Sequence, residues 1–288
     1  MDHVEQLDLP DVKLSVTVHG DGPVVIAAHG FPDDASTFRG QIPALVEAGY
    51  RVVVPTMRGY APSGTARSGR YDLLALGGDL VALADRYSPR DPVRILGHDW
   101  GAAAGYAAAA LAPGRVAGLA ALAVPHLRAF LRGYATAAQV RRSWYMAFFQ
   151  LRGVADVAVR ANDMALLDRL WRDWSPGYVA SAAEMAAVKA GIRGRIGPVL
   201  GYYRALPGVL AGGSARRILL APTTVPTLRL QGAEDGCIGA EVGADEARFH
   251  AARFERYVID GAGHFLQRER PEEVNRRLLA FFGAASAR

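Results

Sequence analysis

The sequence predicts an α/β fold with a mainly parallel central sheet, flanked by helices and interrupted by a helical insertion. Three observations lead to this prediction. Short, continuously apolar runs alternate with segments of helical periodicity, as in βαβ units. This rhythm stops between about residues 125 and 222, where aromatic, helix-compatible segments replace the strand-like runs. The 288 residues, 51% hydrophobic and 21% charged, suffice for one large core plus an insert.

The first half of the chain supplies most of the expected strands. Residues 12–19 alternate apolar and polar side chains, which predicts a half-buried antiparallel strand. Residues 24–28 are continuously apolar, as expected of a strand that is buried on both faces. We expect further strands at 51–55, 93–96 and 116–124, and helices at 42–48, 72–87 and 102–111.

The last part of the chain returns to the same pattern. Strands are expected at 227–230 and 257–259, and Pro271 begins a final helix with one apolar face. We therefore expect a core made of residues 1–126 and 223–288, with residues 127–222 forming a helical cap over the active site.

Composition and charge exclude several classes of protein. The net charge is +5, but the basic residues are scattered, whereas a nucleic-acid groove needs concentrated charge with interleaved aromatic side chains. The longest apolar stretch, 102–112, is far shorter than the roughly 20 residues that span a bilayer. Because the amino terminus carries acids and lacks an apolar signal region, we expect a cytoplasmic protein with no membrane or nucleic-acid partner.

The single cysteine, Cys237, limits the chemistry further. One cysteine can form neither an internal disulfide nor a cysteine-rich metal site. We expect its side chain to be a small buried one.

The stretch RILGHDWGAAAGY, residues 94–106, predicts a strand, a tight turn and a helix. A nucleophile elbow has this layout, and usually presents a serine in the pattern G-x-S-x-G. Asp99 holds the place of that serine, and the pattern occurs nowhere else in the chain. Asp99 could alternatively cap the following helix. The flanking Gly97 and Gly101 favour the elbow, which needs small residues at both places.

Polar groups follow other strands of the predicted sheet. Asp235 lies in LRLQGAEDG and His264 in IDGAGHF, so the chain order is nucleophile, acid, histidine, as in hydrolases that use an elbow. We expect Asp235 to orient His264, with Glu234 as the alternative acid.

Backbone groups near the elbow are candidates for an oxyanion hole. The N–H of Phe31, in the loop HGFPDD, and the N–H of Trp100, which follows the nucleophile, are the expected donors. His29 and His98 are expected to be structural hydrogen-bonding groups. A metal site could be imagined from His29, His98, Asp99 and His264. No metal-ligand spacing supports it, so neither a metal nor a cofactor is expected.

With these motifs, the chain resembles the aspartate-nucleophile branch of the α/β-hydrolases, and most closely the epoxide hydrolases. The motifs that carry the resemblance extend over nearly the whole length: HGFP, RGYAPSG, GHDWGA, GAEDGCI and GAGHFLQRERPEEV. The resemblance implies two cap tyrosines that activate the epoxide. These are Tyr145 in WYMAFFQLRG and Tyr203 in GYYRAL, with Tyr202 as the alternative to Tyr203. Thr56 departs from the family, in which many members have an acidic residue at this place.

The chemistry of a carboxylate nucleophile agrees with this resemblance. An Asp side chain titrates near pH 4, so it is ionised at neutral pH and can attack saturated carbon without a base. The ester formed on Asp99 can then be hydrolysed by water that His264 activates, with Asp235 fixing the imidazole. A small apolar epoxide and water are therefore the expected partners.

Two alternatives remain open at this point. A haloalkane or haloacid dehalogenase would use the same three residues, with indole N–H groups as halide donors; the candidates are Trp100, Trp144, Trp171 and Trp174. A ligand receptor without catalysis could share the same fold. The sequence also leaves open whether the protein is a monomer or a homodimer.

Overall fold

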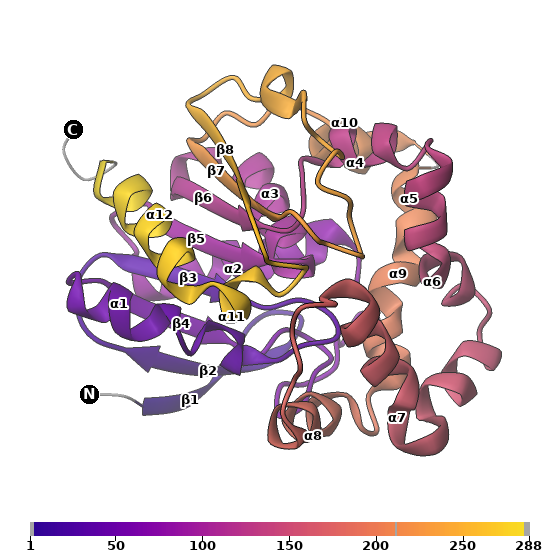
Figure 1. The fold of residues 1–288 in the computed structure, drawn as a ribbon. Coiled ribbons are helices and arrows are strands. Elements are labelled where there is room, and N and C mark those ends of the chain that lie inside the picture. Colours follow the sequence, from indigo (N-terminus) through magenta and orange to yellow (C-terminus); the bar gives the residue numbers. More distant parts are fainter. Residues whose placement is uncertain (1–2, 211, 285–288) are drawn as a thin grey trace.

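A single eight-stranded sheet forms the centre of the part of the chain that the structure describes, residues 3–210 and 212–284 of a computed structural model (Figure 1). The strands lie in the order β1-β2-β4-β3-β5-β6-β7-β8. Their bounds are β1 His3–Asp8, β2 Lys13–His19, β3 Val24–Ala28, β4 Arg51–Pro55, β5 Val93–His98, β6 Val116–Leu122, β7 Thr227–Gly232 and β8 Phe254–Ile259. Strand β2 pairs antiparallel with β1 and β4, and all other pairs are parallel. The predicted fold class is confirmed.

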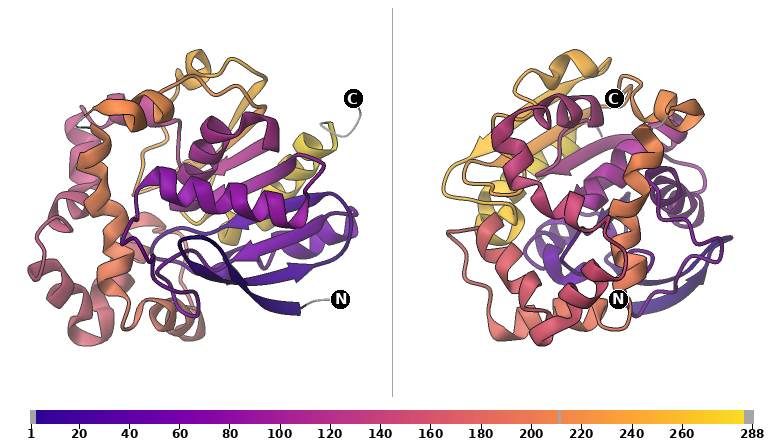
Figure 2. Two further views of the ribbon diagram at one scale, coloured as in Figure 1. Left: turned by 180° about the vertical axis from the view of Figure 1, so that it is seen from behind. Right: turned by 90° about the vertical axis from the view of Figure 1, so that its right-hand side faces the viewer.

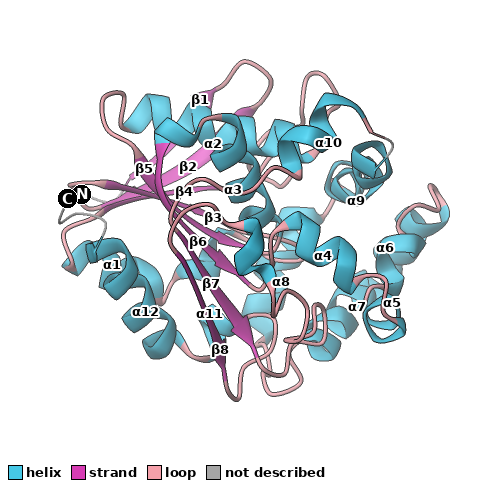
Figure 3. Ribbon diagram, turned by 90° about the horizontal axis from the view of Figure 1, so that it is seen from above, coloured by secondary structure: helices cyan, strands magenta, loops and turns pink. Residues whose placement is uncertain are grey.

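Helices cover both faces of this sheet (Figure 3). On one face lie α2, Leu73–Tyr87, and α3, Trp100–Leu111, which pack against each other. On the other face lie α1, Gln41–Glu47, α11, Leu266–Glu269, and α12, Pro271–Ala284. The apolar strands supply side chains to both layers, as a parallel sheet covered on both faces requires.

Among the described residues, helices α4 to α10 lie between β6 and β7, at the end of the sheet where the parallel strands finish (Figures 1 and 2). They are α4 Leu127–Gly133, α5 Ala137–Arg142, α6 Trp144–Phe148, α7 Val154–Trp174, α8 Ala182–Ile192, α9 Ile196–Leu210 and α10 Gly213–Leu219. One apolar core cluster continues from the sheet into these helices, since it contains both Ile26 of β3 and Tyr145 of α6. Within the described residues, we find no helix with the length and apolar character needed to cross a bilayer.

An ion-pair network joins this helical segment to the sheet. Ser181 and Glu184 form a capping box that begins α8. The Glu184 carboxylate also pairs with Arg39 at 2.7 Å and with Arg268 at 3.2 Å, and Arg268 in turn pairs with Asp33 at 2.7 Å. Because Arg268 and Asp33 are buried, this network fixes α8 against the loop that follows β3.

Candidate active site

The turn between β5 and α3 holds Asp99 in an unusual backbone conformation. Its φ is 50° and its ψ is −119°, a region that a residue with a side chain rarely adopts. The Asp99 side chain makes no capping hydrogen bond to α3, so the simple capping interpretation does not describe it. A Cβ atom at Gly101 would lie 1.9 Å from the carbonyl oxygen of Ala28, and one at Gly97 would lie 2.4 Å from that of Gly101. The close packing of this turn therefore requires both glycines.

Asp99, His264 and Asp235 meet at the ends of three different strands. His264 Nε2 lies 3.5 Å from Asp99 Oδ2, and His264 Nδ1 lies 2.9 Å from Asp235 Oδ2. All three side chains are buried. Glu234, the alternative acid, is exposed, so the structure brings Asp235 rather than Glu234 to the histidine.

Asp235 is held by donors on both of its oxygens. Oδ1 accepts the backbone N–H groups of Cys237 at 2.7 Å and Ile238 at 2.9 Å, and Oδ2 accepts Gln231 Nε2 at 2.8 Å. The guanidinium of the buried Arg229 donates to Gln231 Oε1 at 2.5 Å and so fixes the orientation of that amide. Four donors, counting His264, thus satisfy a carboxylate that is removed from water.

Two opposing effects set the protonation of His264. Burial alone would lower its pKa, but the Asp235 carboxylate, the Cys237 side chain and the Asp99 carboxylate outweigh burial and raise the pKa well above the ordinary 6.5. The imidazole therefore favours its charged form while both carboxylates are ionised.

One of the two expected oxyanion donors already contacts Asp99. The backbone N–H of Phe31 donates to Asp99 Oδ1 at 2.7 Å. Trp100 is the first residue of α3, so its N–H is at the helix N-terminus, where backbone donors lack partners within the helix. The second carboxylate oxygen of Asp99, Oδ2, is the one that lies near His264. The two carboxylate oxygens are thus placed in different surroundings.

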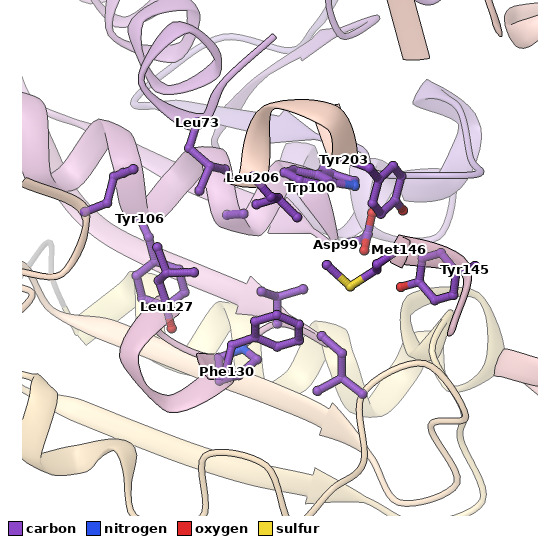
Figure 4. Close-up of a pocket in the computed structure, with 15 residues that line it drawn as sticks. Leu73, Asp99, Trp100, Tyr106, Leu127, Phe130, Tyr145, Met146, Tyr203 and Leu206 are labelled. Carbon is purple, nitrogen blue, oxygen red and sulfur yellow. The ribbon is translucent and has the colours of Figure 1, made fainter. Parts of the chain in front are cut away.

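Tyr145 of α6 and Tyr203 of α9 lie near Asp99, with their rings 5.6 Å apart edge to face (Figure 4). The buried Tyr203 hydroxyl has no hydrogen-bond partner in the part of the chain that the structure describes, and the Tyr145 hydroxyl lies 3.2 Å from Cys237 Sγ. Burial, followed by the nearby Cys237 and Asp99, raises the pKa of both phenols well above 10. Both therefore remain protonated and able to donate. Tyr202 instead donates its hydroxyl to the Arg58 carbonyl at 2.7 Å.

A pocket opens beside Asp99 and includes about 660 Å³ of empty space, its mouth included (Figure 4). Among the fifteen described residues that line it, Asp99 is the one that carries a charge. Aliphatic and aromatic side chains from α2, α3, α4, α6, α9 and α10 form most of the wall. Such a site suits a small, largely apolar molecule with one polar reacting group.

The remaining predicted residues have structural contacts. His29 donates from Nδ1 to the Gly30 carbonyl at 3.0 Å and accepts the Met57 N–H on Nε2 at 3.0 Å. His98 Nε2 donates to the His264 carbonyl at 2.9 Å. The Trp171 indole donates to the Pro32 carbonyl at 2.6 Å, and neither Trp171 nor Trp144 is among the described residues that line the pocket.

Sequence reasoning did not foresee two residues at this site. Cys237 is buried, as expected, but its sulfur lies with Asp99 and His264 in a group of three potential metal-ligand atoms within 4.8 Å of one another. Gln231 was missed because a polar residue near the end of a strand belongs to no motif. The stretch LRLQGAEDG gave only a weak signal, since it pointed to Asp235 in the turn and not to the strand residue that supports it.

The fold and the elbow place this chain in a known family. A model of the α/β-hydrolase fold matches residues 23–271, and the chain belongs to that family. Epoxide hydrolase A of Mycobacterium tuberculosis is 33% identical to it over 96% of this chain and 95% of the relative. The chain therefore belongs, more narrowly, to the epoxide hydrolases, and the prediction of a hydrolytic enzyme is confirmed.

Two further comparisons agree. Epoxide hydrolase B of Mycobacterium tuberculosis is 28% identical over 91% of this chain and 92% of the relative. The crystal structure of epoxide hydrolase A from Mycobacterium thermoresistibile is 29% identical, covers 98% of both chains and superposes with a TM-score of 0.84. The similarity thus extends over the sheet and the helical segment together.

Proposed function

We propose that this enzyme opens epoxides to vicinal diols through a covalent ester on Asp99. The observation that carries the proposal is the arrangement around one pocket. A carboxylate at a strained elbow lies 3.5 Å from an imidazole, and two buried phenols approach the same space. The family to which the chain belongs supports the choice of substrate.

In the first step, Asp99 Oδ2 forms a bond to one epoxide carbon while the bond from that carbon to the ring oxygen breaks. The ring oxygen becomes an alkoxide and takes a proton, for which Tyr145 and Tyr203 are the donors. Their raised pKa values keep them protonated until the alkoxide forms. Asp99 Oδ1 stays with the Phe31 N–H during this step.

In the second step, His264 removes a proton from water, and the hydroxide adds to the Asp99 carbonyl carbon. The N–H groups of Phe31 and Trp100 stabilise the resulting oxyanion, an interaction whose loss can cost roughly 3 to 4 kcal/mol. When the ester breaks, His264 returns its proton to the departing diol. The proton left on the new carboxyl group goes back to the phenolate, so the cycle consumes one epoxide and one water.

Formation of the ester lowers the pKa of His264 and so allows it to act as a base. The Asp99 carboxylate is one of the groups that raise the pKa of His264. Esterification removes that negative charge, so the pKa of His264 falls. The imidazolium then releases its proton to solvent before it acts as the base, and takes one up again when the Asp99 carboxylate is restored. The cycle uses side chains and water alone. We assign helices α4 to α10 as the cap that excludes bulk water from it.

The test is to stop the cycle at the ester. A His264→Gln variant lacks the base, so after exposure to 1,2-epoxyhexane its intact mass should rise by the mass of one whole epoxide. Peptide mapping should place the addition on Asp99. The same variant carrying Asp99→Asn is the matched control and should remain unmodified.

A parallel incubation with 1-bromohexane separates the alternatives. A gain of the alkyl group without halogen, in the absence of any epoxide adduct, would identify a dehalogenase instead. If folded His264→Gln gains mass from neither compound, and the wild-type enzyme turns over neither, the covalent mechanism is wrong and a ligand receptor becomes the better explanation.

A further inference from the structure

The pocket follows one face of helix α3 away from Asp99. Asp99, Ala103 and Tyr106 all line it, at the spacing of neighbours on one face of a helix. Seven residues of helix correspond to a rise of about 10 Å. Figure 4 shows Tyr106 and Leu127 on one side of the labelled lining and Asp99 toward the other side, beside Tyr203 and Tyr145. The pocket is therefore elongated, with the carboxylate at one end.

The wall along this path is apolar. Leu127 and Phe130 come from α4, Leu206 from α9 and Leu219 from α10. Among the described residues that line the pocket, none beyond Asp99 carries a charge that could pair with a charged group on the ligand. A charged tail would lose its hydration there without gaining a partner.

Buried aromatic rings pack behind Tyr145, in the part of the pocket where Asp99 lies. Phe31 and Phe149 have no exposed surface and Trp174 has 1%, so no space the size of a water molecule adjoins the first two. Phe31 and Phe149 meet at 5.6 Å, and Trp174 lies 4.9 Å from the ring of Tyr145. A second large substituent on the epoxide has no room among these rings.

From this one-sided shape we infer that the substrates are terminal epoxides with one extended, uncharged apolar substituent. The substituent lies along α3, with Ala103 beside its middle and Tyr106 at its far end. This assignment rests on the proposed epoxide chemistry and names the class of substrate that the pocket selects. Ala103 acts as a positioning and specificity residue, because its small side chain leaves the path open.

The test uses a series of 1,2-epoxyalkanes of increasing length, together with internal epoxides of equal carbon number. In the wild type, kcat/KM should rise about fourfold for each added methylene, which corresponds to 0.8 kcal/mol of buried CH₂, until the tail reaches Tyr106. Internal epoxides with two alkyl groups should react with a kcat/KM at least about tenfold lower than their terminal isomers.

Two variants should change, in opposite directions, the length of the epoxide substituent that the pocket accepts. Ala103→Leu should lower the ratio of kcat/KM between long and short epoxides, and Tyr106→Leu should move the optimum to longer chains. The ratio is measured within each variant, so a partly unfolded sample does not alter it. Ala110→Leu, on the exposed part of α3, is the control and should keep the wild-type ratio.

Different results would contradict the proposed function and the assignment of the substrate. If terminal epoxides of every length and internal epoxides all remain intact, the proposed function is wrong. If epoxides are opened but internal ones react as fast as terminal ones, or Ala103→Leu leaves the length ratio unchanged, the reaction stands and the assignment of the substrate is wrong.

Discussion

Tyr202 and Tyr203 are adjacent in the sequence, yet their hydroxyls have different surroundings: that of Tyr202 donates to the Arg58 carbonyl at 2.7 Å, while that of Tyr203 has no hydrogen-bond partner among the described residues. Both side chains are buried, but Tyr203 lines the pocket at Asp99. Burial of an unpaired hydroxyl is costly unless a ligand or water satisfies it. Tyr203 is therefore the one of the two that is placed to meet a substrate.

Tyr203→Phe should lower kcat/KM for epoxides by roughly 100-fold, because a general acid contributes at least about this much. Tyr202→Phe is a matched control. It should retain activity and lose about 1 kcal/mol of unfolding free energy with the hydrogen bond to Arg58. Steady-state kinetics and denaturant unfolding measure the two effects. Equal activity losses in both variants would contradict the assignment.

The pKa of His264 should be higher in the free enzyme than in the ester. Burial lowers this pKa, while the carboxylates of Asp235 and Asp99 raise it. Esterification removes the negative charge of Asp99. Hydrolysis needs neutral His264, so its rate should increase with pH through the lower pKa of the ester. Rapid-quench kinetics report the ester, and NMR titration of His264 reports the free enzyme. Equal pKa values of His264 in the free enzyme and in the ester would show that the charge of Asp99 does not raise this pKa.

Gln231 should affect the hydrolysis of the ester on Asp99 and not its formation. Gln231→Leu removes a donor from Asp235 and leaves an Arg229 donor without its partner, so the hydrolysis rate should fall by roughly tenfold. Formation of the ester does not use His264 as a base and should change little. Rapid quench separates the two rates. Equal slowing of both would show a general structural defect instead.

Glu246 should make stability depend on pH away from the active site. Burial raises its pKa from 4.5 to about 7, although the Arg229 guanidinium at 3.4 Å lowers it. Because the folded pKa is the higher one, this stabilisation is complete below pH 4.5 and is lost as the pH rises through about 7. Relative to Glu246→Gln, the wild type should lose up to ~3 kcal/mol between these limits. If the unfolding free energies of the wild type and of Glu246→Gln change with pH in parallel, Glu246 does not cause the dependence.

Two glycine substitutions should have opposite effects on folding. A Cβ at Gly101 would lie 1.9 Å from the Ala28 carbonyl oxygen, so Gly101→Ala should unfold the elbow or prevent expression. Apart from its chain neighbours and the backbone of its own helix, no described atom lies within 4 Å of a Cβ at Gly78, inside α2, so Gly78→Ala should add about 0.5 to 1 kcal/mol of stability. Thermal unfolding distinguishes them, and a folded, active Gly101→Ala would show that the turn is less tightly packed.

Much of the fold and site could be predicted from local patterns, because each buried strand carries its own apolar run and each motif follows a strand end. Strand β1 could not, since it lies at the sheet edge and shows no alternation, with Val4 66% exposed. Tyr202 and Tyr203 could not be separated, since residues roughly 100° apart on a helix can both be buried. Only the packing of α9 on the RGY turn distinguishes them.

The backbone of Asp99 has a consequence for how this enzyme could change over time. Glycine would adopt φ 50° and ψ −119° with less strain, so Asp99→Gly should relieve the turn while removing the nucleophile. Selection for stability alone would therefore favour an inactive protein. The carboxylate at the elbow is a place where stability and activity are in conflict, and its retention requires continuous selection on turnover.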